Sequence, residues 1–428
     1  MNEPLPAEGN KDGKTEDNRL NDNRAEENRT ENSRTEDNKT ADTEKNGQTD
    51  KRKETLNEIH LVRALAILAV LIVHATSQTV ADLEKSTTLY PFYNFMNIFF
   101  KYGTPTFIFL SAFVLFYNYV DRKQKQGLIH RFYRRRLKFV VLPYLVFSIV
   151  YFVASDWMFP VDQSWTERGK AFLVQLLTGK AHTHLYFVFV SIQFYVLFPL
   201  LLYIVWLKPR LLKHAFWAGA MLQWLFVLLN HYFWQIDAKG SIALSYISFY
   251  FAGAWMGVYF RDFLSWMERG WKFAMWIIWV VFGLLHVHAY HMWRIHGIAL
   301  DTKWFELVWH MHTLATALVL FHFCFWVIHK LPERLTSLLI RLGLYSFGIY
   351  LIHPLILMVY RPWIITSSVW AYHAMVAAGG LLALTLSALI VHVSFRHWNH
   401  AWILFGQPPP HVRSVAREVR DEKRRFMI

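Results

Sequence analysis

Arg63 and His74 stand eleven residues apart in the first long apolar segment of the sequence. At about 100° per residue, this spacing amounts to roughly three full turns, so both side chains would share one helix face, about 16 Å apart along the axis. Ionisable groups inside an apolar span are costly and usually face an interior cavity. The pair therefore indicates a site, with two alternatives left open. Arg63 could extend its charged end to the membrane interface, and His74 could be a hydrogen-bonded core histidine.

The segments that would position this pair are long and apolar. Apolar residues make up 54% of the 428 residues and aromatic residues 17%, more than most soluble domains contain. The apolar runs are near the 20 residues that cross a bilayer, and Trp and Tyr often stand at their ends. We expect an all-α polytopic membrane protein with about ten transmembrane helices, at residues 59–80, 91–119, 137–155, 184–206, 215–235, 241–260, 273–291, 304–329, 342–360 and 368–395.

The chain begins with a segment of a different composition. Residues 1–56 are rich in Asn, Thr, Glu, Asp, Lys and Arg, and contain no apolar core that could serve as a signal peptide. Such a segment buries too little apolar area to offset its ordering entropy, so we predict a disordered, charged cytoplasmic tail. A loose repeat could instead serve recognition. It consists of basic residues spaced by five: Arg19, Arg24, Arg29, Arg34 and Lys39.

Charge predicts how the chain lies in the membrane. The formal net charge is +14, but the basic residues flank the apolar spans, which favours membrane orientation over nucleic-acid binding. With ten spans, every loop on one side holds at least as many Lys and Arg residues as any loop on the other. We therefore predict a multi-pass protein of the cell membrane with both termini cytoplasmic. The expected domains are the tail at 1–56, a transmembrane domain at 57–400 and a basic cytoplasmic C-terminal tail at 401–428.

Metal chemistry is disfavoured by the spacing of the potential ligands. The chain has one cysteine, Cys324, so neither an intrachain disulfide nor a cysteine-based metal site is possible. Histidines cluster, but helical residues two apart point to nearly opposite faces and chelate poorly. We expect no metal site at the clusters His182/His184, His286/His288/His291 and His310/His312.

The Arg63 and His74 spacing resembles the signature of the membrane acyltransferase-3 family. Further segments in the same order are similar to motifs of that family, although Ala112 stands where the second motif commonly has glycine. Each motif is weak alone, but together they cover about residues 57–400. The similar segments are Gly103-Thr-Pro105 through Ser111-Ala-Phe, Arg134-Arg-Arg136 through Pro143-Tyr144, His184-Leu-Tyr186-Phe, and Gly343 through Tyr350, His353 and Pro354.

The resemblance implies transfer of an acyl group, usually acetyl from acetyl-CoA, to hydroxyls of cell-surface carbohydrates or lipids. A neutral histidine suits the general base, and an apolar surround favours that neutral form. Arginine forks bind the phosphates of coenzyme A. We expect His74 to be the base, with Arg63 and the run Arg134, Arg135 and Arg136 binding the donor. The arginine run could serve membrane orientation alone.

Other candidate residues follow from the same motifs. They are Glu58, Ser111, Tyr350 and His353, of which the last two could be packing residues. Arg63 lies too far along the helix to stabilise an oxyanion beside His74, but an extended pantetheine arm could bridge the gap.

The resulting hypothesis is a membrane-bound O-acyltransferase that moves an acyl group, with acetyl as the expected one, from acyl-CoA to a hydroxyl of a cell-envelope carbohydrate or exopolysaccharide. Its partners would be acyl-CoA as donor substrate, a surface or lipid-linked glycan and the bilayer, with no nucleic acid and no permanently bound cofactor. The alternative is a transporter or flippase of glycan precursors or acylated intermediates, because many spans and interior ionisable groups suit that class too. Bound acyl-CoA would distinguish the two.

Overall fold

The computed structural model describes residues 56–123, 126–160, 162–366 and 368–410. The tail predicted at residues 1–56 therefore lies outside the described residues, except for residue 56. The described parts contain helices and turns and no strand. In chain order the α-helices are α2 (Asn57–Asp82), α3 (Tyr90–Phe99), α4 (Gly103–Tyr119), α5 (Leu128–Arg136), α6 (Leu142–Met158), α7 (Trp165–Thr178), α8 (Tyr186–Leu207), α9 (Ala215–Leu229), α10 (Ile247–Val258), α11 (Phe260–Trp266), α12 (Lys272–His296), α13 (Thr302–Lys330), α14 (Glu333–Tyr360), α15 (Val369–His397) and α16 (Trp402–Phe405).

Short turns of other helix types join several of these elements. The π-helical turns are η1 (Leu137–Val141), η3 (Asn230–Trp234) and η6 (Met267–Trp271), and the 3-10 turns are η2 (Pro209–His214), η4 (Lys239–Ser241), η5 (Ala243–Tyr246) and η7 (Arg361–Trp363).

The predicted fold class is confirmed. Within the described residues, nine helical segments are long and apolar enough to cross a membrane. The segment predicted as the sixth span, at 241–260, is instead a shorter apolar helical segment at Ala243–Val258. Two 3-10 turns, at 239–241 and 243–246, precede α10 and leave it with 12 residues. At 1.5 Å per residue that helix is about 18 Å long, less than the hydrocarbon thickness of about 30 Å.

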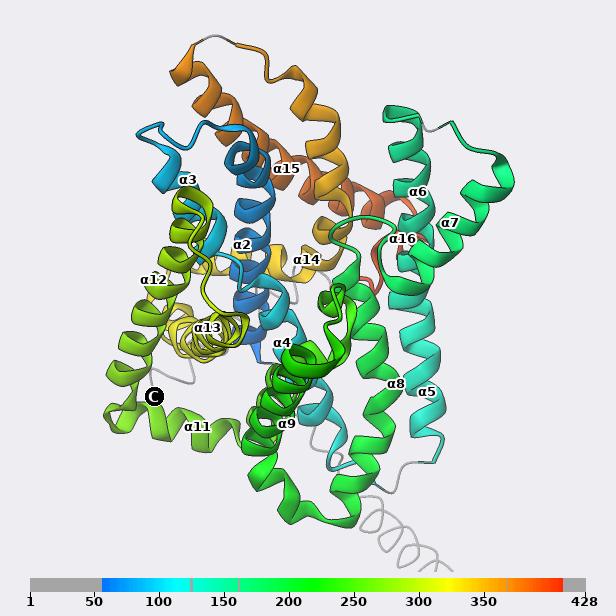
Figure 1. The fold of residues 1–428 in the computed structure, drawn as a ribbon. Helices are drawn as coiled ribbons and strands as arrows, with labels where there is room; N and C mark the ends of the chain where they lie inside the picture. Colours follow the sequence, from blue (N-terminus) through cyan, green and yellow to red (C-terminus); the bar gives the residue numbers. More distant parts are fainter. Residues whose placement is uncertain (1–55, 124–125, 161, 367, 411–428) are drawn as a thin grey trace, which may run out of the picture. The chain divides into compact units, whose positions relative to one another are not determined.

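Helix α2 lies at the centre of the arrangement. It packs against α3, α4, α13, α14 and α15, and Figure 1 shows it in blue among them. The contact with α14 is close because Gly343 faces the backbone of His60, where any Cβ would collide with the His60 carbonyl oxygen. The helix that carries Arg63 and His74 is therefore held on several sides by other helices.

The second predicted span, 91–119, is broken in the middle. α3 ends at Phe99 and α4 begins at Gly103, with a turn at residues 100–102 between them. Pro105 lies in the first turn of α4, where its missing N–H costs nothing. Gly103 fits because a Cβ there would collide with the Val70 side chain of α2. Irregular backbone at membrane depth is tolerated where it lines a cavity or is buried in protein.

An additional helix precedes the fourth span. Helix α7 begins with a capping box between Ser164 and Glu167 and ends at Gly179, whose φ is 72°. All of its residues keep some exposed surface, and Trp165 is 81% exposed. The chain then turns through residues 180–185 before α8 begins at Tyr186. This turn carries His182 and His184 into the structure just ahead of the membrane-spanning helix.

Candidate active site

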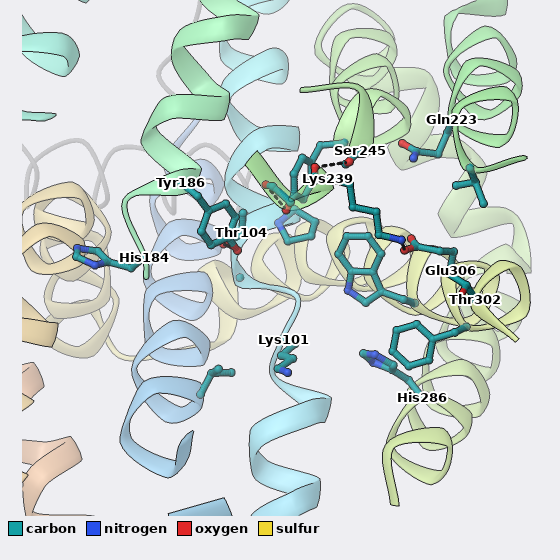
Figure 2. A pocket seen from close by; sticks show the side chains of 18 of the residues that line it. Lys101, Thr104, His184, Tyr186, Gln223, Lys239, Ser245, His286, Thr302 and Glu306 are labelled. Carbon is teal, nitrogen blue, oxygen red and sulfur yellow. Dashed lines mark hydrogen bonds and ion pairs between the residues drawn. The ribbon is translucent and has the colours of Figure 1, made fainter. Parts of the chain in front are cut away.

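A cavity of about 490 Å³ lies beside α2. Its walls come from α2, the turn between α3 and α4, the turn before α8, the segment from α9 to η5, and helices α12, α13 and α14. Figure 2 shows His184 at one side of this cavity and the charged ends of Lys239 and Glu306 together at the other. A concave site of this size with convergent polar groups is the usual form of a small-molecule site.

His74 lines this cavity, as do Val70 and Val73 from the same helix. Its ring meets two other histidine rings edge to face, with centroids 5.0 Å from His353 and 6.4 Å from His184. The backbone carbonyl of His74 accepts a hydrogen bond of 2.5 Å from Nη2 of Arg361, which follows α14. The backbone of α2 is thus fixed at His74 while the imidazole lines the cavity.

The histidines around His74 are held by tyrosines. Tyr151 stacks on His182 with centroids 4.3 Å apart and donates its hydroxyl hydrogen to the carbonyl of Leu351 at 2.8 Å. The hydroxyl of Tyr350 donates to the backbone carbonyl of His184. Three helices, α2, α6 and α14, and the turn before α8 therefore meet around one group of imidazoles.

His353 has one defined tautomer in this arrangement. Its Nδ1 lies 3.0 Å from the carbonyl oxygen of Ile349, so Nδ1 carries the hydrogen. Its buried Nε2 then has a lone pair, and no protein hydrogen-bond partner for it lies in the described part of the chain.

The two histidines of the turn before α8 are neutral at physiological pH. Burial, and after it the positive charge of Arg361, lowers the pKa of His182 to about 4. Burial also holds the pKa of His184 well below its ordinary value of 6.5. Their Nδ1 atoms lie 2.9 Å apart, so one donates and the other accepts. His74 consequently faces uncharged imidazoles at this side.

The far side of the cavity combines aromatic and hydrogen-bonding side chains. Lys239 and Glu306 form an ion pair, and Glu306 Oε2 lies 3.5 Å from Nδ1 of His310. The aromatic residues that line the cavity are Phe100, Tyr186, Phe226, Tyr246, Tyr290, Phe305, Trp309 and Tyr350. Flat rings together with amide, hydroxyl and charged groups suit a ligand that has both C–H faces and hydroxyls.

Arg63 lies in a different environment on the same helix. Its guanidinium interacts electrostatically with Tyr195 and Arg136. Arg136 in turn lies over the Tyr195 ring, with its Cζ 4.5 Å from the ring centroid, and Ser111 donates to the Tyr195 hydroxyl at 3.2 Å. Arg63 is not among the residues that line the cavity.

The predicted site residues thus divide into two groups. His74 and Tyr350 line the cavity, and His353 lies beside His74, whereas Arg63, Arg136 and Ser111 gather around Tyr195. Outside both groups, Arg134 and Arg135 are exposed and Glu58 is buried.

Sequence reasoning missed several residues at the site. His182 was considered only as a metal ligand, His184 only as a metal ligand and as part of a family motif, and Arg361 was not singled out. Lys101 was passed over, although a lysine inside a predicted apolar span is itself a signal. Among the described residues, no group of three or more His, Cys, Asp or Glu side chains is placed to hold a metal ion.

The family comparison agrees with this arrangement. A family model for an acyltransferase domain, of the acyltransferase-3 type, matches residues 56–392, well over half of the chain. The chain belongs to the acyltransferase-3 family. The prediction from the sequence motifs is confirmed, and the membership together with the long apolar helices makes this a multi-pass membrane protein. The cytoplasmic placement of both termini stays a prediction.

Among named relatives, the chain is similar to the "Probable poly-beta-1,6-N-acetyl-D-glucosamine export protein" of Staphylococcus aureus strain MSSA476. The two are 23% identical over 357 residues, which cover 78% of this chain and 89% of the relative. A protein of the same name from Staphylococcus epidermidis is 22% identical over 360 residues, or 79% of this chain and 89% of the relative. No solved structure matches the chain.

Proposed function

We propose that this protein transfers an acetyl group from acyl-CoA to a hydroxyl of a cell-envelope carbohydrate or exopolysaccharide, with His74 as the general base. The observation that carries the proposal is the placement of His74 on the wall of a cavity lined by aromatic and hydrogen-bonding side chains, in a member of the acyltransferase-3 family. Within the described residues, the His74 ring has no protein hydrogen-bond partner, which leaves its nitrogens available to substrate.

The reaction at His74 balances as a simple acyl transfer. The imidazole accepts the proton of the acceptor hydroxyl as the hydroxyl oxygen attacks the thioester carbonyl carbon. The tetrahedral intermediate then collapses, the C–S bond breaks, and the leaving thiolate takes the proton back from the imidazolium. The products are the O-acetyl ester and free coenzyme A, and His74 returns to its neutral form.

The acceptor would occupy the aromatic side of the cavity. Rings such as Tyr246 and Trp309 can cover the C–H face of a sugar, while Gln223, Lys239 and Glu306 offer groups that bind hydroxyls. The volume of about 490 Å³ falls within the range of small-ligand pockets.

The donor would approach from the Arg63 end of α2. Arg63 and Arg136 place two guanidinium groups near each other, and their mutual repulsion would be relieved by the phosphates of coenzyme A. The thioester could then reach His74 along the helix through the extended pantetheine arm, over about 16 Å.

A second candidate function is glycan export, because the relatives are named as export proteins. A cavity beside a membrane-embedded histidine would suit a passage for a sugar as well. The two candidates differ in their need for acyl-CoA, since an exporter without transfer chemistry has no use for a bound thioester.

The test is transfer by the full chain, purified in lipid nanodiscs, with radiolabelled acetyl-CoA and a panel of envelope oligosaccharides. We expect labelled ester on the acceptor and stoichiometric release of coenzyme A. Mass analysis of surface glycans from a deletion strain should show fewer O-acetyl groups. Export would replace transfer under a different set of results. The purified protein would bind no acyl-CoA, and the deletion strain would keep the acetyl groups on its glycans but retain the polymer inside the cell.

A further inference from the structure

Lys101 is an unusual residue because it lies inside a membrane-spanning segment with no acidic partner among the described residues. It sits in the turn between α3 and α4, within the span Tyr90–Tyr119, and lines the same cavity as His74. Its Nζ lies 4.6 Å from the centroid of the Tyr290 ring. In the part of the chain that the structure describes, no carboxylate lies within 4 Å of this ammonium group.

The neighbouring cation does not compensate for this charge. Arg294 interacts electrostatically with Lys101, and its own hydrogen bonds go to neutral amides, Asn94 at 2.9 Å and Asn97 at 3.5 Å. Placing an uncompensated ammonium at membrane depth is costly, and such groups usually face a cavity where they serve function. The positive charge at this wall of the cavity is therefore suited to a negative charge that arises in the cavity.

The fold places this ammonium in the wall of the same cavity as the candidate base. Gly103 lets the start of α4 press against Val70, which is one turn before His74 on α2. Lys101 is two residues before Gly103, and His74 and His286 line the same cavity. Figure 2 shows Lys101 at the cavity with Thr104 and Tyr186 nearby.

We propose that Lys101 stabilises the oxyanion of the tetrahedral intermediate in acyl transfer; this inference rests on the proposed function. When the acceptor oxygen bonds to the thioester carbonyl, the carbonyl π electrons move onto its oxygen, and the ammonium faces that new charge. The charge returns to the carbonyl when the C–S bond breaks, so Lys101 neither gains nor loses a proton. Preorganised charge of this kind acts strongly where water is excluded.

Groups near Lys101 add a hydrogen-bond donor and positive partial charge to the same wall of the cavity. The Tyr186 hydroxyl donates to Oγ1 of Thr104 at 3.2 Å, which leaves the Thr104 hydroxyl hydrogen free to donate. The N-terminus of α4 adds positive partial charge at this place. A purely structural Lys101 would instead act only by holding Tyr290 through its cation–π contact.

The experiment compares Lys101→Met and Lys101→Arg with wild-type protein in nanodiscs, measuring kcat, KM and the Kd for acetyl-CoA. Lys101→Met should lower kcat about a hundred- to a thousandfold, with Kd within about threefold of wild type, because the charge acts mainly in the transition state. Lys101→Arg keeps the positive charge and should retain at least about a tenth of kcat, on the same reasoning. The matched control is Lys180→Met, which removes an exposed lysine outside the cavity and should leave kcat unchanged.

Each outcome decides the question. Wild-type kcat in Lys101→Met, or a loss confined to Kd and KM, would overturn the assignment. A kcat of folded Lys101→Arg well below about a tenth of the wild-type value would also overturn it, since charge would then not be what matters. Because this arm is compared with wild type, it still decides if the methionine variant fails to fold. Absence of transfer by wild-type protein would reject the proposed function itself, whereas normal transfer by Lys101→Met would reject this inference alone.

Discussion

The two ends of α2 present different chemistry from the same helix. At the His74 end, the imidazole lies against the rings of His184 and His353 and beside a cavity. At the Arg63 end, the neighbours are a second guanidinium, from Arg136, and the ring of Tyr195 instead of neutral imidazoles. One end is suited to moving a proton, and the other to binding a fixed negative charge.

This difference indicates a division of work along one helix. A base must be neutral and must touch the reacting atoms, so it benefits from uncharged neighbours and open space. Phosphate binding requires permanent positive charge and can occur far from the reaction. The rigid axial separation of about 16 Å would then set where the thioester lies relative to the donor phosphates.

Removing the base should have the largest effect. His74→Ala should lower the transfer rate about a hundred- to ten-thousandfold, because a positioned general base acts mainly in the transition state. The Kd for acetyl-CoA should remain close to wild type, since Arg63 and Arg136 are untouched. Both quantities can be measured with labelled acetyl-CoA on protein in nanodiscs.

The matched control for this variant is His288→Ala, which removes an exposed histidine that does not line the cavity. It should leave the rate unchanged. Turnover by His74→Ala at the wild-type rate would rule out the catalytic assignment and with it the contrast between the two ends of α2.

Substitutions at the arginine end should act on binding. Arg63→Ala and Arg136→Ala should each raise the Kd for acetyl-CoA, about tenfold or more if one charge-assisted contact of 1.5–3 kcal/mol is lost. Arg63→Lys should restore only part of the affinity, because a point charge cannot reproduce the fork. Arg134→Ala serves as the control, since Arg134 is exposed and outside the Tyr195 group. Equal effects at Arg134 and Arg136 would show that only the summed charge of the run matters.

The sequence was informative where local pattern decides structure. Apolar runs near 20 residues predicted nearly all the spans, and the Arg63 and His74 spacing correctly placed both residues on one continuous helix. The short α10 was missed because hydropathy does not distinguish α-helix from the 3-10 turns that replace its first residues. The break before Gly103 was missed for a related reason, since it depends on contact with Val70 of another helix.

The composition of the cavity could not be read from sequence because it depends on which segments meet. Arg361 directly follows an apolar run, and nothing in the sequence shows that its guanidinium reaches the His74 carbonyl 287 residues away. His182 and His184 were weighed as a helical pair, but they lie in a turn, where their side chains can face the same way and bond to each other.

The smallest effect we predict concerns the stability of the His74 end at low pH. Because burial and Arg361 lower the pKa of His182 from 6.5 to about 4, the folded protein resists a proton that the unfolded chain accepts between these values. Its contribution to stability is therefore fully present above pH 6.5 and is lost as the pH falls toward 4. The thermal midpoint of the detergent-solubilised protein should fall by several degrees over this interval.

His182→Gln should show a shallower fall, though not a flat one, since the pKa of His184 is lowered as well. His400→Gln, at an exposed position, should follow the wild-type curve. Parallel curves for wild type and His182→Gln would mean that His182 does not contribute to the fall of the thermal midpoint with pH.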